Sequence, residues 1–132
     1  MPAKKVLFLC TGNSCRSQMA EALVNARFGA AWQAVSAGTK PAGYVHPMAL
    51  QALAEIGITH AGRSKLAEEF KGTDFDLVIT VCDSAAEECP LWLGRGKKMH
   101  HSFPDPAVSG ELDDFRKVRD QIALALASLL NI

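Results

Sequence analysis

Apolar positions recur along the chain with two periods, one typical of strands buried in a sheet and one typical of helices. Strands are predicted over 5–10, 34–37, 75–81 and 99–102, and the third of these (F-D-L-V-I-T-V) is the richest in branched side chains. Helices are predicted over 18–28, 47–56 and 115–129, with shorter ones over 64–70 and 83–88. Strands that alternate with helices in this order predict an α/β fold, in which a parallel sheet is covered on both faces.

The helical period also predicts which positions face the core. In the first helix these are Met19, Leu23 and Ala26. The last helix carries a longer apolar stripe, formed by Phe115, Val118, Ile122, Ala125 and Leu129. Both helices are therefore expected to pack against the rest of the protein along one side.

Length and composition predict a single soluble domain over residues 1–132. Apolar residues make up 48% of the chain, and 14 basic residues balance 14 acidic ones. A net charge of zero argues against a nucleic-acid-binding protein, which needs a basic surface. No apolar stretch approaches the roughly 18 residues of a membrane span, and the one near the N-terminus is too short for a signal peptide. We expect a cytoplasmic protein that acts as a monomer, without a membrane or nucleic-acid partner.

The run C-T-G-N-S-C-R-S (10–17) lies where a predicted strand gives way to a helix. Backbone N–H groups of such a turn and helix start form an anion site, which favours the thiolate of Cys10 as a nucleophile. Gly12 and Asn13 suit the turn, since glycine has no side chain and asparagine tolerates the left-handed conformation. Arg16 can hold two oxygens of an anion, and Ser17 can donate a hydrogen bond to the sulfur. The spacing C-x5-R alone also occurs by chance, but these neighbours favour the functional interpretation.

Two more residues follow the ends of predicted strands, as Cys10 does. Cys82 follows the strand over 75–81, and Asp105 follows the strand over 99–102. Ligands of parallel α/β sheets bind beyond the carboxyl ends of the strands, so we hypothesise that the first and third strands are neighbours. Asp105 would then be a general acid for a leaving oxygen, although the Asp-Pro pair taken by itself favours an ordinary turn.

The four cysteines, Cys10, Cys15, Cys82 and Cys89, leave several interpretations open. In a reducing cytosol they favour catalysis, redox exchange, metal binding or simple burial over structural disulfides. Cys15 is expected to face away from the anion and to serve packing. Cys82 and Cys89 are either inert buried thiols or a redox pair. No metal is expected, because C-x4-C and C-x6-C match no common zinc pattern and the four histidines are expected at the surface or as caps.

The segment C-T-G-N-S-C-R-S-Q-M-A-E (10–21) resembles the phosphate loop of the low-molecular-weight tyrosine phosphatase superfamily, and most closely that of its thioredoxin-coupled arsenate reductases. The resemblance continues in order over the whole chain with V-S-A-G (35–38), V-I-T-V-C-D (78–83), C-P (89–90), D-P-A (105–107) and F-R-K-V-R-D-Q-I (115–122). Its most specific element is the pair Cys82 and Cys89, which simple phosphatases do not need. It implies a three-layer sandwich, in which helices flank a four-stranded parallel sheet of order 2-1-3-4.

The resemblance also implies a mechanism. The oxyanion would be bound by Thr11, Gly12, Asn13, Ser14, Cys15 and Arg16. Cys10 would attack arsenate there while Asp105 protonates the departing oxygen, and Cys82 would then attack Cys10 and release arsenite. Cys89 would attack Cys82, leaving a Cys82–Cys89 disulfide for a reductant; the spacing of the pair favours thioredoxin, and a glutaredoxin-type partner is the alternative. A dithiol supplies the two electrons that take arsenic from +5 to +3, so no cofactor is implied, and phosphate or sulfate would mimic the substrate.

One departure concerns a potassium ion that some relatives hold near Asn13 and Ser36. The stretch that would complete its ligands reads G-R-S-K (62–65) in this chain. Two cations there would repel a metal ion, and Lys65 is expected to replace its charge. We therefore predict no potassium dependence.

Two other functions stay open. A tyrosine phosphatase would hydrolyse phosphomonoesters through a phosphocysteine at Cys10. Such enzymes grip the phenol ring with aromatic side chains, whereas this chain has one tyrosine, Tyr44, and carries Ala107 after its Asp-Pro pair. A redox-sensing or arsenic-sensing protein would use the same thiols. We favour the arsenate reductase, with residual phosphatase activity because phosphate and arsenate share a shape.

Overall fold

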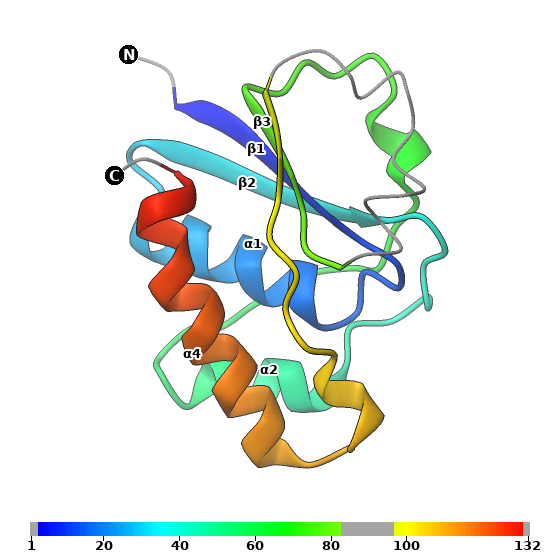
Figure 1. The fold of residues 1–132 in the computed structure, drawn as a ribbon, viewed down its shortest axis with the longest axis vertical. Helices are drawn as coiled ribbons and strands as arrows, with labels where there is room; N and C mark the ends of the chain where they lie inside the picture. The colour runs from blue at the N-terminus through cyan, green and yellow to red at the C-terminus, as the bar shows by residue number, and fades with distance from the viewer. Residues whose placement is uncertain (1–2, 83–96, 131–132) are drawn as a thin grey trace.

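The computed structural model describes residues 3–82 and 97–130. Four strands of these residues form one parallel sheet. Its strands are β1 (Lys4–Cys10), β2 (Trp32–Gly38), β3 (Leu77–Thr80) and β4 (Lys97–His100). They lie in the order β2-β1-β3-β4, and every neighbouring pair is parallel (Figure 1). This confirms the predicted sheet and the hypothesis that the first and third strands are neighbours.

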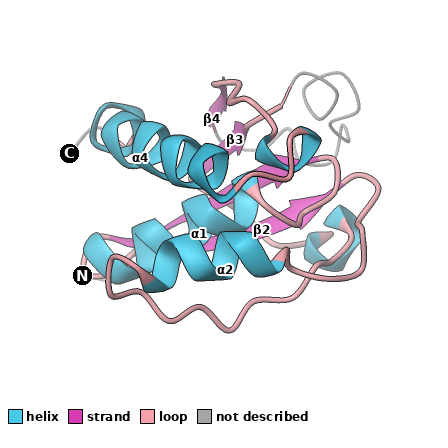
Figure 2. Ribbon diagram, turned by 90° about the horizontal axis from the view of Figure 1, so that it is seen from below, coloured by secondary structure: helices cyan, strands magenta, loops and turns pink. Residues whose placement is uncertain are grey.

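The α-helices of the described residues are α1 (Arg16–Arg27), α2 (Pro47–Ala54) and α4 (Leu112–Leu129). Two short 3-10 turns, η1 (Ala67–Phe70) and η3 (Pro106–Val108), complete the regular structure. The three α-helices gather on one face of the sheet, and the η1 turn lies on the other (Figures 1 and 2). The predicted helix over 83–88 falls outside the described residues.

The core explains why the central strands read as continuous apolar runs. The last five residues of β1 and all of β3 are buried, because both strands have neighbours on each side and are covered on both faces. Met19 and Leu23 of α1 are fully buried, whereas Ala26, which was expected beside them, is exposed. In α4 the buried apolar residues are Phe115, Val118, Ile122 and Leu126, so the predicted stripe is confirmed except that Ala125 and Leu129 are only partly buried.

The prediction of a helix over 64–70 is wrong in its first half. Lys65 uses its backbone in tertiary hydrogen bonds, donating to Asn13 Oδ1 at 2.9 Å and accepting from the Gly38 amide at 2.8 Å. Leu66 forms an isolated parallel bridge with Gly38. A helix would need the same backbone groups for itself, so helical structure begins only at Ala67.

Most other elements differ from their predicted bounds by a few residues, and three of these differences matter here. Helix α1 begins at Arg16 rather than at residue 18, so the arginine of the motif stands in its first turn. β3 is shorter than predicted, and β4 covers 97–100 rather than 99–102. β4 is an edge strand of mostly exposed polar residues, which gives little hydrophobic signal.

The carboxyl ends of β1, β2 and β3 meet at one edge of the sheet. The backbone N–H of Val81 donates to Leu9 O at 2.9 Å, so the residues that follow β3 stay beside those that follow β1. In the described part of the chain, no helix is long and apolar enough to cross a membrane.

Candidate active site

The loop between β1 and α1 turns its carbonyl groups outward. The carbonyl oxygens of residues 10, 11, 12 and 14 accept hydrogen bonds from the amides of Thr39, Lys40, Ala42 and His46, at 2.8 to 3.1 Å. Asn13 adopts the left-handed conformation with φ 49°, as its residue type predicted. With the carbonyls engaged elsewhere, the loop presents N–H groups to its inner side, which suits an anion.

Gly38 allows the loop to lie close against β2. A Cβ atom at position 38 would lie 2.5 Å from Thr11 O and 3.1 Å from the Asn13 amide nitrogen. Contacts of that kind do not occur in real proteins without backbone movement. The V-S-A-G segment therefore ends in glycine because the anion loop packs on top of it.

Cys10 lies at the centre of this loop with two polar partners. Its Sγ lies 2.8 Å from Ser17 Oγ and accepts a hydrogen bond from the Asn13 backbone N–H at 3.1 Å. Asn13 Nδ2 donates to the same Ser17 Oγ at 2.8 Å. Cys10 is only 2% exposed. The predicted contact between Ser17 and the sulfur is present, and both partners can stabilise a thiolate.

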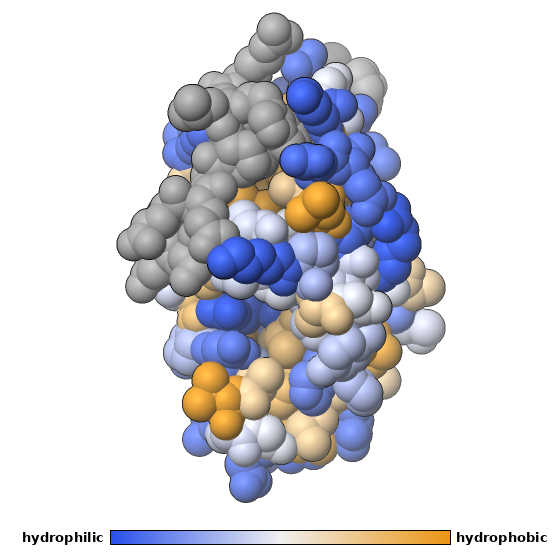
Figure 3. All heavy atoms as spheres, turned by 90° about the vertical axis from the view of Figure 1, so that its right-hand side faces the viewer, coloured by the Kyte–Doolittle hydropathy of each residue, from blue (hydrophilic) through white to orange (hydrophobic). Residues whose placement is uncertain are grey.

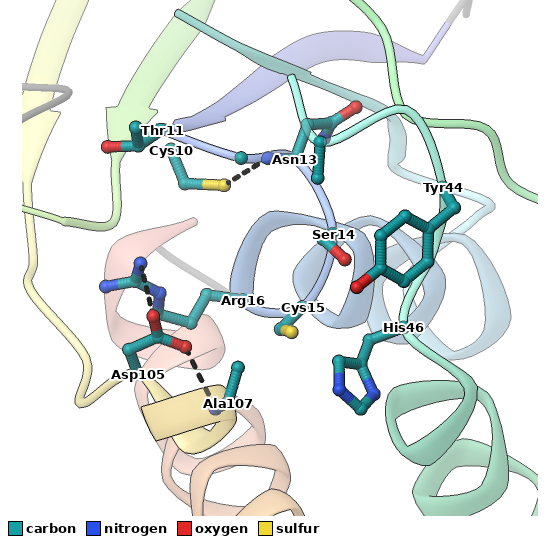
Figure 4. Close-up of a pocket in the computed structure, with 12 residues that line it drawn as sticks. Cys10, Thr11, Asn13, Ser14, Cys15, Arg16, Tyr44, His46, Asp105 and Ala107 are labelled. Carbon is teal, nitrogen blue, oxygen red and sulfur yellow. Dashed lines mark hydrogen bonds and ion pairs between the residues drawn. The ribbon is translucent and has the colours of Figure 1, made fainter. Parts of the chain in front are cut away.

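A pocket of about 270 Å³ opens above Cys10. Its lining residues include Cys10 to Arg16 of the loop, Asp105 and Ala107 on one side, and Ala42, Tyr44 and His46. Figure 4 shows Arg16 and Asp105 facing each other across from Tyr44 and His46. Within this pocket lie the predicted nucleophile, the predicted oxyanion-binding loop and the predicted general acid.

Arg16 and Asp105 hold each other at the rim of the pocket. An Arg16 guanidinium nitrogen lies 3.7 Å from Asp105 Oδ2, and another donates to Phe103 O at 3.3 Å. Asp105 caps η3, where its Oδ1 accepts a hydrogen bond from the Ala107 amide at 3.0 Å (Figure 4). Asp105 therefore both forms the Asp-Pro turn and lies beside the pocket, with its carboxylate directed at the Arg16 guanidinium.

Cys15 differs from Cys10 in its surroundings. It is among the residues that line the pocket, although we expected it to face away from the anion. Burial, and next to it the nearby charge of Asp105, raises the pKa of the Cys15 thiol to about 12. Cys15 therefore stays a thiol at neutral pH and is a poor nucleophile.

Cys82 lies on the same edge of the sheet as Cys10. Its Sγ is 3.3 Å from Thr11 Oγ1, in the residue that follows Cys10, and its side chain is buried. Cys10, Cys15 and Cys82 are all free thiols. Cys89 falls outside the described residues. No group of three His, Cys, Asp or Glu side chains that could hold a metal occurs within 3–82 and 97–130.

A buried polar cluster supports the loop from behind. Gln18 Nε2 donates to Asn13 O at 3.1 Å and to Arg63 O at 2.8 Å, and Gln18 Oε1 lies 2.8 Å from His60 Nε2. Glu21 accepts a hydrogen bond from Ser36 Oγ at 2.9 Å. The side chains of His60 and Lys65 flank this carboxylate, at 3.7 and 3.8 Å. The side chain of His60 is thus largely buried rather than at the surface.

In this cluster the side chains of His60 and Lys65 both approach the Glu21 carboxylate, and all three are largely buried. Burial lowers the pKa of His60, and Glu21 opposes that shift. Burial likewise lowers the pKa of Lys65, again against the attraction of Glu21. Lys65 Nζ also donates to Arg63 O at 3.0 Å. His60 and Glu21 were not singled out from the sequence, although a Gln and a Glu three residues apart in the helix after the loop were a signal for buried polar contacts.

Tyr44 and His46, like Ala42, line the pocket although the sequence did not place them there. Tyr44 is 56% exposed, and His46 caps α2 by accepting a hydrogen bond from the Met48 amide at 3.1 Å. The expectation that the histidines act as caps is thus confirmed for His46. Figure 3 looks onto the edge at which the strands end, and hydrophobic side chains are scattered there among hydrophilic ones.

Comparison with known proteins covers nearly the whole sequence. Residues 5–132 match the family model described as low molecular weight phosphotyrosine protein phosphatase. Arsenate reductase 2 of Staphylococcus haemolyticus is 40% identical over 129 residues, which cover 97% of each chain. A solved arsenate reductase in the phosphate-binding state superposes with a TM-score of 0.86 at 32% identity, over 97% of each chain. A low molecular weight protein tyrosine phosphatase from T. tengcongensis reaches a TM-score of 0.81 at 26% identity, covering 98% of this chain and 99% of its own.

Proposed function

This chain belongs to the low molecular weight phosphotyrosine protein phosphatase family, and from that premise we propose that it reduces arsenate to arsenite through a relay of three cysteines. The observation that carries the proposal is the contact of 3.3 Å between Cys82 Sγ and Thr11 Oγ1. It sets a second free thiol beside the loop that holds Cys10. Hydrolysis of a phosphate ester through a cysteine needs only one thiol and water. The relatives named as arsenate reductases support the same choice.

In the first step, the inner side of the loop and the Arg16 guanidinium bind the arsenate oxygens. Cys10 attacks arsenic as a thiolate, an S–As bond forms, and one As–O bond breaks. Asp105, when protonated, gives its proton to a departing hydroxyl group of arsenate, which leaves as water. The N–H of Asn13, 3.1 Å from the sulfur, and the Ser17 hydroxyl at 2.8 Å favour the thiolate that starts the step.

In the second step, the Cys82 thiolate attacks the Cys10 sulfur. The electron pair of the S–As bond moves to arsenic, which leaves as arsenite in the +3 state, and a Cys10–Cys82 disulfide remains. Cys89 then attacks Cys82, so that Cys10 returns as a thiolate and the oxidised pair becomes Cys82–Cys89. The dithiol of thioredoxin reduces this pair by thiol–disulfide exchange.

The surroundings fit a reaction that begins from reduced thiols. Free thiols at Cys10 and Cys82 persist in a reducing compartment, so we place the enzyme in the cytoplasm. That it acts as a monomer also remains a proposal, which analytical ultracentrifugation tests.

Replacing Cys89 tests the relay. Wild-type protein and Cys89→Ser are each mixed with arsenate, thioredoxin, thioredoxin reductase and NADPH, and oxidation of NADPH is followed. The wild type should turn over repeatedly, whereas the variant should oxidise no more than one equivalent of NADPH per protein. Hydrolysis of p-nitrophenyl phosphate is the control, because it should survive in both proteins. Equal turnover by both would remove Cys89 from the mechanism.

The second candidate is a phosphatase that hydrolyses phosphomonoesters through a phosphocysteine at Cys10. The family match and the exposed Tyr44 in the pocket wall favour it, since an aromatic ring there can contact an aryl leaving group. Only one such ring was found in the pocket wall among the described residues, and Ala107 stands on the side of Asp105. This function predicts fast p-nitrophenyl phosphate hydrolysis that is insensitive to changes at Cys82 or Cys89, and no reduction of arsenate.

A further inference from the structure

A second, smaller pocket lies near the amino ends of β1 and β2, on the face of the sheet that carries η1 rather than the three α-helices (Figures 1 and 2). Its volume is about 180 Å³. The residues that line it are Lys5, Gln33, Val35, Phe70, Thr73 and Phe75. We propose that this apolar slot is a second ligand site, which binds an aromatic carboxylate of one ring. The site is independent of the proposed function.

The floor of the slot is formed by two neighbouring strands. Lys5 of β1 pairs with Gln33 of β2, so their side chains point to the same face of the sheet. Val35 lies two residues further along β2 and shares that face. Ser36, the next residue, points the other way, because its Oγ donates to Glu21 of α1. The floor therefore presents one apolar side chain beside an ammonium group and an amide group.

Two phenyl rings form the wall of the slot. Phe70 of η1 and Phe75 meet edge to face, with ring centroids 5.8 Å apart and ring planes at 71°. The turn between them is closed by the Thr73 backbone N–H, which donates to Phe70 O at 2.9 Å. The Asp76 backbone N–H donates to Lys5 O, also at 2.9 Å. Backbone hydrogen bonds thus hold the wall against β1 before any ligand binds.

Size and charge select the class of ligand. An apolar cavity of about 150 Å³ holds one benzene ring, so 180 Å³ leaves room for a single ring and a small head group. Lys5 carries the one charge among the described residues that line the slot. Its ammonium, the Gln33 amide and the Thr73 hydroxyl have no protein partner within 3–82 and 97–130. A carboxylate accepts hydrogen bonds from groups of all three kinds, and a ligand ring can pack against phenyl side chains.

A matched pair of probes tests the site in the wild-type protein. The acid probe is 4-fluorobenzoate and its neutral control is 4-fluorobenzamide. Fluorine NMR measures the affinity of each, and ¹H–¹⁵N spectra locate it through the amides of Gln33, Val35, Phe70 and Thr73. We expect the acid to bind with a Kd of about 1 mM or tighter, as suits a ligand of about ten non-hydrogen atoms. The amide should bind about two- to fivefold more weakly, which is the range of one exposed ion pair.

Two variants separate the head group from the ring. Lys5→Met keeps an aliphatic side chain and removes the charge, so the preference for the acid over the amide should vanish. The affinity for the amide should stay within about twofold of the wild type. Val35→Phe places a ring in the slot and should abolish binding of both probes. The ¹H–¹⁵N spectrum of each variant without a probe confirms that it folds, and Lys5→Met alone suffices if Val35→Phe does not.

Three results would overturn the proposal. One is the absence of shifts at the slot amides up to about 10 mM acid probe, ten times the expected Kd. Another is equal affinity of the wild type for the acid and the amide. The third is a set of shifts confined to residues 10–17 and 42–46, which would place the probe in the pocket above Cys10 only. Because arsenate is absent from every sample, failure of arsenate reduction would count against the proposed function and not against this site.

Discussion

The loop over 10–17 has two sides that are built in opposite ways. On its back, toward α1 and the loop over 60–65, the polar side chains are buried and satisfied within the protein. Asn13 and Gln18 are fully buried, and each makes hydrogen bonds through both its oxygen and its nitrogen. On its front, toward the pocket, Ser14 Oγ is buried without a partner among the described residues, and Arg16 meets Asp105 only at 3.7 Å.

This difference separates the parts that hold the loop from the parts that act on a ligand. A buried polar group without a partner costs about 1–3 kcal/mol, so a fold tolerates few of them unless a ligand completes them. The satisfied back fixes the backbone, and the unsatisfied front remains available to an oxyanion. Changes on the front should therefore alter chemistry and spare stability, whereas changes on the back should lower the free energy of unfolding.

The largest effect is expected for Arg16→Lys on the front. Lysine keeps the charge but cannot hold two oxygens in one plane, so arsenate turnover should fall about 10²- to 10³-fold, as when an oxyanion donor is removed. The melting temperature should change by less than about 2 °C, because among residues 3–82 and 97–130 the guanidinium makes one long hydrogen bond and one distant ion pair. Turnover assays and calorimetry check both. A stable variant with near-normal turnover would mean that Arg16 does not bind the anion.

The next effect contrasts two glycines, one on each side. Gly62→Ala on the back would drive a methyl group into His60 and Gln18, and should lower the free energy of unfolding by about 1–3 kcal/mol. Gly12→Ala on the front is its matched control, because the nearest atoms to its new Cβ lie at 3.9 Å. Urea unfolding measures the difference. If both variants were equally stable, the back would be more adaptable than its packing indicates.

The two sides also differ in what the sequence could predict. The front lies within one short motif, so Cys10, Arg16 and Ser17 could be assigned from residue types and from a strand followed by a helix. The back joins residues 42 positions apart, as in the contact of Gln18 with His60, and no local pattern reports such a pairing. The order of the strands in the sheet was predicted only from the resemblance to a family. The structure confirms that order, and the family match confirms the resemblance.

The errors in the predicted elements have the same origin. Residues 64–66 have a helical composition, yet the backbone of Lys65 is hydrogen-bonded to Asn13 and Gly38 and so does not join a helix. The ends of β4 were misplaced because an exposed edge strand lacks an apolar pattern. Local sequence decides structure where burial is local, and long-range hydrogen bonds override it at the loop.

A smaller effect is expected for Thr11, which lies between the front and Cys82. Thr11→Val removes the hydroxyl 3.3 Å from Cys82 Sγ at nearly constant size. Arsenite release in a single turnover should slow about three- to tenfold, because that hydroxyl orients the second thiol. Thr11→Ser should restore most of the rate. Hydrolysis of p-nitrophenyl phosphate should fall less than arsenite release; an equal fall in both would assign Thr11 to anion binding alone.

The smallest effect, no change at all, is expected when potassium replaces sodium. Lys65 Nζ lies 3.8 Å from Glu21 Oε1 and donates to Arg63 O at 3.0 Å, so the back of the loop already contains an internal cation. A second cation would have to displace this ammonium group or approach it closely, and the Coulomb repulsion between two like charges in a buried site opposes both. Melting temperature and turnover should therefore be equal in the two salts. Lys65→Met sharpens the test, because it leaves Glu21 without that partner and should melt lower than the wild type in either salt. If potassium specifically stabilised the wild type, Lys65 would not be the cation that completes the back of the loop.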